Sequence, residues 1–114
     1  MTQEEKQLLL KDLCARLPYG VIVRKNDGVR ESDNKLLDID MFDELINYVY
    51  KDIKPYLRPM SSMTEEEEIY YNMIYITLKF YEKEDWLNAH HFDYRGLIPM
   101  SLALEAPEGM YKTE

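Results

Sequence analysis

The segment "TQEEKQLLLKDLCARLPYGVIVRKNDG", residues 2 to 28, contains the signals that decide the fold class. Thr2 and Glu5 have the spacing of a capping box, in which each side chain accepts a backbone N–H that the first helical turn leaves unpaired. Pro18 and Gly20 then predict where the helix ends. Between these signals, apolar residues recur at three- and four-residue spacing: Leu9, Leu10, Leu13, Cys14 and Leu17. The segment therefore predicts an N-terminal helix with this stripe on the core, where Cys14, the only cysteine, is a buried apolar residue and not a reactive thiol.

A small antiparallel sheet is expected to follow this helix. The β-branched residues at 20 to 25 predict a strand, and Asn26-Asp27-Gly28 tolerate the positive φ of a tight hairpin turn. The second strand lies within 29 to 39, beginning at Val29 or displaced to "KLLDI" at 35 to 39. A third lies within 53 to 59, where two prolines exclude a helix and favour an edge strand or an extended connector.

Two further helical signals lie outside the predicted strands. Asp40 can cap a helix of about three turns that carries Phe42, Leu45, Ile46 and Val49. In "SSMTEEEE", residues 61 to 68, Thr64 and Glu67 form a second capping box. The four glutamates fill the first turn of that helix and require no bound ion, because negative charge is favourable there.

The helical segment from 65 to 91 dominates the C-terminal half of the chain. We expect one of its faces to lie on the core, at Ile69, Met73, Ile76, Thr77 and Phe80. Beyond it, "SLALEA" at 101 to 106 predicts a short strand or an extended arm. Because 114 residues suit one core, the prediction is a single α+β domain over residues 1 to 114, with an N-terminal helix, a small antiparallel sheet and C-terminal helices.

The charge of the chain limits its partners and its location. A net charge of -8 argues against nucleic-acid binding, which gains affinity from lysines and arginines. The acidity serves solubility or, as a weaker hypothesis, an imitation of DNA. No apolar run approaches the roughly 18 residues of a membrane span, and the N-terminus is acidic where a signal peptide is basic. We therefore expect a cytoplasmic protein that binds neither nucleic acid nor membrane.

Tyrosines supply the main indication of a binding surface. The chain has ten of them, and aromatic side chains with a polar tip are enriched at protein–protein interfaces. Those in the long helical segment are Tyr70, Tyr71, Tyr75 and Tyr81. They predict a surface for an unknown protein partner or a homodimer, with half-buried packing as the alternative.

The stretch "DWLNAHHFDYRG", residues 85 to 96, is the candidate for metal or acid–base chemistry. Its candidate ligands are His90, His91, Asp85 and Asp93. Adjacent histidines on a helix point about 100° apart, unlike the four-residue spacing that holds two imidazoles on one ion. The favoured interpretation is a structural helix end, where a partial positive charge on the histidines is favourable. No catalytic residue, cofactor or metal is therefore predicted.

Four blocks of the chain resemble a family of small uncharacterised proteins of gut Bacteroides and related bacteria, often encoded near phage or mobile-element genes. The blocks are "LCARLPYGV", "IKPYLRPMSSMTEEE", "DWLNAHHFDYRGLI" and "LALEAPEGMY". The resemblance implies a shared architecture and a prophage origin, but the family has no established activity, cofactor or ligand.

The function expected from the sequence is a non-enzymatic interaction or accessory protein of a prophage or mobile element. The sequence has no glycine-rich phosphate loop, no nucleophile–base–acid set and no basic face. The alternative is a small metal-binding or hydrolytic protein that uses the His90 and His91 region, and the weaker alternative is an acidic DNA-mimic inhibitor.

Overall fold

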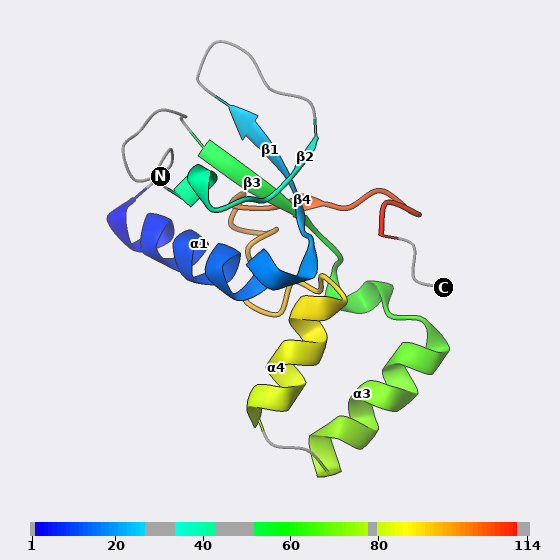
Figure 1. Cartoon of the computed structure of the whole chain (residues 1–114). Coiled ribbons are helices and arrows are strands. Elements are labelled where there is room, and N and C mark those ends of the chain that lie inside the picture. The colour runs from blue at the N-terminus through cyan, green and yellow to red at the C-terminus, as the bar shows by residue number, and fades with distance from the viewer. Residues whose placement is uncertain (1, 27–33, 43–51, 78–79, 112–114) are drawn as a thin grey trace.

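The helices and strands combine into an α+β arrangement, as predicted (Figure 1). The computed structural model describes residues 2–26, 34–42, 52–77 and 80–111, with the side chains of 26, 52, 74–77, 80 and 81 left undescribed. The elements in chain order are α1 (Gln3–Arg16), a 3-10 turn (Leu17–Tyr19), β1 (Ile22–Asn26), β2 (Lys35–Leu36), β3 (Asp52–Leu57), a second 3-10 turn (Met60–Ser62), α3 (Glu65–Thr77), α4 (Phe80–Ala89) and β4 (Leu104–Glu105).

The sheet has the strand order β2-β1-β3-β4. β1 is antiparallel to β2 and to β3, which confirms the predicted strand after Gly20 and the displaced position of the second strand. β4 pairs in parallel with the end of β3, so the sheet is mixed and not wholly antiparallel.

The prediction that β3 is an edge strand or a connector is wrong, because β3 lies between β1 and β4. Pro55 pairs with Val23 of β1, but β4 pairs only with Tyr56 and Leu57, beyond the proline. The missing N–H of Pro55 therefore costs no hydrogen bond on the β4 side.

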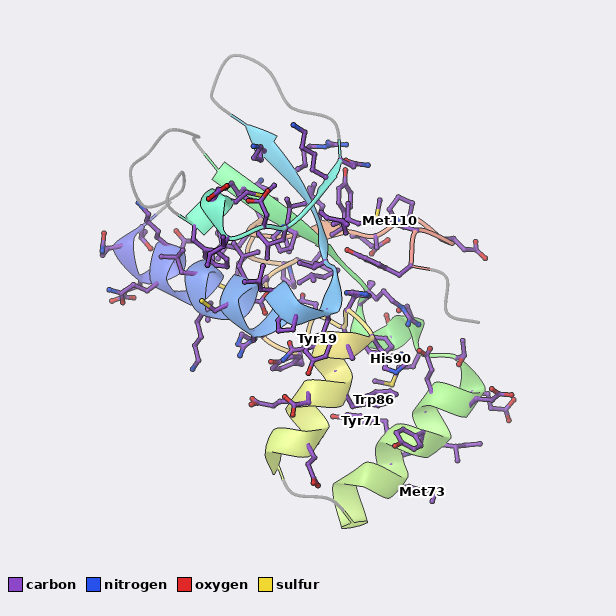
Figure 2. All side chains as sticks on the ribbon, viewed as in Figure 1. Tyr19, Tyr71, Met73, Trp86, His90 and Met110 are labelled. Atoms are coloured by element: carbon purple, nitrogen blue, oxygen red, sulfur yellow. The ribbon has the colours of Figure 1, made fainter. Side chains whose placement is uncertain are left out.

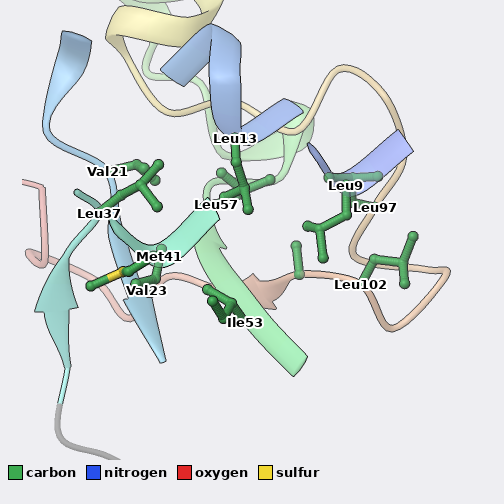
Figure 3. Packing of buried hydrophobic residues seen from close by; sticks show 11 residues of the cluster. Leu9, Leu13, Val21, Val23, Leu37, Met41, Ile53, Leu57, Leu97 and Leu102 are labelled. Atoms are coloured by element: carbon green, nitrogen blue, oxygen red, sulfur yellow. The ribbon is translucent and has the colours of Figure 1, made fainter. Parts of the chain in front are cut away.

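The core lies between α1 and the sheet (Figure 3). Leu9 and Leu13 of α1 are buried, as predicted, and removing such apolar surface from water is the main favourable term in folding. The buried core residues are Leu9, Leu13, Val21, Val23, Leu37, Met41, Ile53, Leu57, Leu97, Leu102 and Ala103. Cys14 is exposed, so the prediction of a buried cysteine is wrong. The buried face of α1 includes Asp12 and Arg16 instead of Cys14.

Local capping signals are the most accurate part of the sequence prediction. Thr2 Oγ1 accepts from the backbone N–H of Glu5 at 3.0 Å, and the Thr2 N–H donates to Glu5 Oε1 at 2.8 Å. The cap near residue 40 is Asp38 and not Asp40, since Asp38 Oδ1 accepts from the Met41 N–H at 3.1 Å. The remainder of that predicted helix, at 43–50, and the predicted hairpin turn at 27–28 lie outside the described residues.

The predicted helical segment of 65 to 91 is two helices, and α3 packs on α4 instead of on the sheet (Figure 1). The second capping box is present, because Thr64 Oγ1 accepts from the Glu67 N–H and the Thr64 N–H donates to Glu67 Oε1. The predicted core face of α3 is wrong where its side chains are described: Ile69 is 56% exposed and Met73 is 57% exposed. The side chains of residues 76, 77 and 80 lie outside the description.

Candidate functional site

The histidines of the chemical candidate stretch lie in the turn that ends α4. The His91 N–H donates to the Asn88 carbonyl at 3.1 Å, and the Phe92 N–H donates to the Leu87 carbonyl at 3.0 Å. His91 has a φ of 63°. This pair of bonds around a left-handed residue is a Schellman motif, with a histidine at the position that glycine usually occupies. The predicted helix end is thus correct, and the motif supplies its physical cause.

His91 is buried, with 7% of its surface exposed, and its ring stacks on Tyr111 at a centroid distance of 3.8 Å. The pKa of His91 is lowered from 6.5 to about 4, chiefly by burial and to a smaller extent by interactions with Arg16, His90 and Arg58. The expectation that positive charge is favourable on the histidines is therefore wrong, because burial outweighs the helix end.

Tyr111 holds the C-terminal segment against the sheet. Its hydroxyl accepts from the Ile22 N–H at 2.8 Å and donates to the Tyr56 carbonyl at 2.7 Å. Burial raises the pKa of Tyr111 to about 12. The hydroxyl thus stays protonated at neutral pH and serves as a structural donor and acceptor between β1 and β3.

A cleft of about 590 Å³ opens where β3 ends, between the start of α3, the end of α4 and the C-terminal segment. Its lining residues are Arg58, Pro59, Ser62, Thr64, Glu66, Glu67, His90, Ala106, Pro107, Glu108, Gly109 and Tyr111. Only one candidate from the sequence, His90, lies in this lining. The cleft is therefore a different site from the one that the His-His pair suggests.

The floor of the cleft is organised by an ion pair between Arg58 and Glu67. Arg58 Nη1 donates to Glu67 Oε2 at 2.8 Å, and Nη2 donates to Glu67 Oε1 at 2.7 Å. The guanidinium also lies 4.2 Å from the ring centroid of Phe92. The hydrogen bonds from Arg58 lower the pKa of Glu67 to about 2, so the carboxylate is ionised at neutral pH.

His90 forms part of the cleft wall and packs on Trp86, with the ring centroids 4.6 Å apart. Its Nδ1 lies 3.7 Å from Glu67 Oε2, which is beyond hydrogen-bond distance. Burial lowers the pKa of His90, although the carboxylate of Glu67 opposes that shift. At neutral pH the cleft therefore presents a neutral imidazole beside a carboxylate that Arg58 already binds.

The two aspartates of the candidate set do not join His90 and His91. Asp93 is buried, and its two carboxylate oxygens accept from the N–H groups of Leu97 and Ile98 at 2.8 and 2.9 Å. Asp85 is exposed on α4. Over the described ranges, no group of three or more histidines, cysteines, aspartates and glutamates could hold a metal ion.

Two of the four candidate tyrosines pack around Trp86 between α3 and α4, and Figure 2 labels one of them, Tyr71. The ring centroids of Tyr70 and Tyr71 lie 5.6 and 6.0 Å from that of Trp86. Tyr71 is half-buried, and Tyr70 is 48% exposed. The side chains of Tyr75 and Tyr81 lie outside the description. Figure 2 places Met73 on the side of α3 that faces away from α4.

A buried charge cluster was missed by the sequence analysis. Asp12 and Arg16 are fully buried, and Arg16 Nε donates to Asp12 Oδ2 at 2.8 Å. Arg95 Nη1 donates to Asp12 Oδ1 at 2.8 Å, and Arg16 Nη2 donates to the Phe92 carbonyl at 2.6 Å. The four-residue spacing of Asp12 and Arg16 is the one signal that could have indicated it. The cluster fastens α1 to the segment that follows α4.

Comparisons with known proteins leave the site to be interpreted from its own geometry. No protein-family model, curated protein or solved structure matches the chain. In the part of the chain that the structure describes, no helix combines the length and apolar character needed to cross a membrane.

Proposed function

We propose that this is a non-enzymatic interaction protein and that the outer face of α3 is its docking surface. The observation that carries the proposal is the exposed apolar stripe formed by Ile69 and Met73, which are 56% and 57% exposed, with Tyr70 at its edge. Tyr70 is 48% exposed, although its ring also contacts Trp86 of α4. Exposed apolar surface that clusters on one face is typical of protein–protein interaction sites. We call these three residues the α3 stripe.

The α3 stripe is supported by a helix that is fixed from its other side. Helical residues advance by about 100°, so Glu67 and Tyr71 point away from Ile69 and Met73. Glu67 binds Arg58, and Tyr71 packs on Trp86. The stripe is therefore presented by an anchored helix, which suits recognition of a partner helix by packing of apolar side chains.

Catalysis is the weaker candidate because the hydroxyl groups of the cleft already serve the fold. Ser62 Oγ donates to the Pro59 carbonyl at 2.6 Å, and Thr64 Oγ1 accepts from the Glu67 N–H. The Tyr111 hydroxyl binds backbone of β1 and β3. The metal-binding alternative is excluded if zinc, nickel or manganese leaves the melting temperature of the protein unchanged. The DNA-mimic hypothesis stays the weakest of the three, since no contact or distance supports it.

The proposal extends to the setting of the protein. We propose a cytoplasmic location, in keeping with a lone exposed thiol that forms no disulfide. The resemblance noted in the sequence supports an accessory role in a prophage or mobile element.

The proposal is tested with a phage-displayed library of random peptides of about sixteen residues, long enough for about four helical turns. Peptides selected on the wild-type protein are measured by fluorescence anisotropy against Ile69→Ser/Met73→Ser. The matched control is Ile39→Ser, which removes an apolar residue that is 72% exposed elsewhere.

We expect binding to be lost in the α3 variant and kept in the control. Peptides that bind both variants equally, or a selection that yields no binder, would refute the docking surface. Melting temperatures near that of the wild type establish that neither variant acts through unfolding, since both replace exposed side chains.

A further inference from the structure

The α3 stripe runs into the cleft without a break. Glu66 precedes Ile69 by three residues, Tyr70 by four and Met73 by seven. These spacings place all four side chains on one face of the helix. Glu66 also lines the cleft. A segment that lies along the α3 stripe would therefore reach the cleft at the N-terminal end of α3.

The cleft presents negative charge at this end. Its lining contains Glu66, Glu67, Glu108 and a single cation, Arg58. Arg58 is held by both oxygens of Glu67, so these two charges offset each other. Glu66 and Glu108 are exposed, and neither carboxylate has an ion-pair partner among the described residues. With His90 neutral, the two carboxylates leave the cleft anionic.

We propose that the occupant of this surface is a helical segment of another protein that combines an apolar stripe with a lysine or arginine, and that this basic side chain enters the cleft beside Glu66 and Glu108. The inference rests on the proposed function of the α3 stripe. Seven residues of helix span roughly 10 Å, so the basic residue stands about two turns from the apolar residue that contacts Met73.

Charge also disfavours a second copy of the chain as the occupant. The protein has a net charge of -8, and each α3 begins with Glu65, Glu66, Glu67 and Glu68. Two copies that meet at this surface both carry this net negative charge, and like charges across an interface are unfavourable. A basic partner removes that cost and adds steering during association.

The test uses the library-selected peptides on two variants of equal net charge. Glu66→Gln/Glu108→Gln removes the two unpaired carboxylates of the cleft. Glu65→Gln/Glu68→Gln removes two exposed carboxylates from the same turn of α3 that do not line the cleft. We expect the selected peptides to carry lysine or arginine about two turns from their apolar residues and to bind the cleft variant about three- to tenfold more weakly than the control variant.

Two outcomes would overturn the inference and leave the α3 stripe standing: neutral or acidic peptides that still require Ile69 and Met73, or equal weakening in both glutamine variants. Sedimentation that finds a dimer dispersed by Ile69→Ser/Met73→Ser would also overturn it, because the occupant would then be a second copy. If binding is indifferent to Ile69 and Met73, the proposed function fails instead.

Discussion

Replacing His91 by asparagine is expected to remove a pH dependence of folding that the wild-type protein has between pH 7.5 and 5. The pKa of His91 is lowered from 6.5 to about 4 in the folded protein, chiefly by burial against Tyr111, with smaller contributions from Arg16, His90 and Arg58. The unfolded chain therefore takes up the proton first. Stability is complete above about pH 6.5 and is lost as pH falls toward 4.

The size of the effect follows from the two pKa values. Linkage between 6.5 and about 4 gives a loss of about 2 kcal/mol in the free energy of unfolding between pH 7.5 and pH 5. Asparagine does not titrate and tolerates the left-handed backbone at this position, where φ is 63°. Loss of the ring stack lowers the free energy of unfolding by about 0.5–1.5 kcal/mol at every pH. This loss is the same at each pH, so it does not alter how stability depends on pH.

The assay is urea denaturation of both proteins at half-unit steps of pH. Subtracting the variant from the wild type removes the common titration of the carboxyl groups. The prediction is that the free energy of unfolding of the wild type, minus that of the variant, decreases by about 2 kcal/mol between pH 7.5 and pH 5. This result supports the burial of a neutral His91. Parallel curves for the two proteins would refute the reasoning, since they would mean that His91 has the same pKa in the folded and unfolded chains.

Two further predictions concern buried polar groups. Asp12→Ala should lower the free energy of unfolding by about 3–5 kcal/mol, because it leaves the fully buried Arg16 without its counterion. In urea denaturation, the double variant Asp12→Ala/Arg16→Met should recover most of that loss. A double variant that is no more stable than Asp12→Ala contradicts this account. Tyr111→Phe keeps the ring stacked on His91 but leaves the Ile22 N–H and the Tyr56 carbonyl without the hydroxyl, so we expect a loss of about 1–3 kcal/mol by the same assay; an unchanged midpoint would show that these backbone groups do not depend on Tyr111.

The candidate site shows how far residue patterns lead toward function. Of the candidates from the sequence, His90 lies in the cleft, but its proposed companions are elsewhere. Asp93 caps the turn at Leu97 and Ile98, and Asp85 is exposed. The residues that do meet His90 are Glu67, which was read only as a helix cap, and Trp86. Arg58 had no signal at all, because its partner lies nine residues away across a turn.

The sequence by itself determined the features that depend on neighbours three to five residues apart. Both capping boxes, the strand after Gly20 and the helix end near His91 follow from hydrogen bonds and apolar spacing within a single element. Those local terms are similar in any surroundings, so they can be read without the rest of the chain.

Only the tertiary structure decided which surfaces those elements cover. The periodicity of α3 indicated an apolar face, and the sequence could not tell that α4 would pack against a different side and leave Ile69 and Met73 in solvent. The parallel pairing of β4, the stack of His91 on Tyr111 and the hydrogen bond from Arg16 to the Phe92 carbonyl likewise join segments that are far apart in the chain. Burial depends on how distant segments meet, and no short run of residues specifies that meeting.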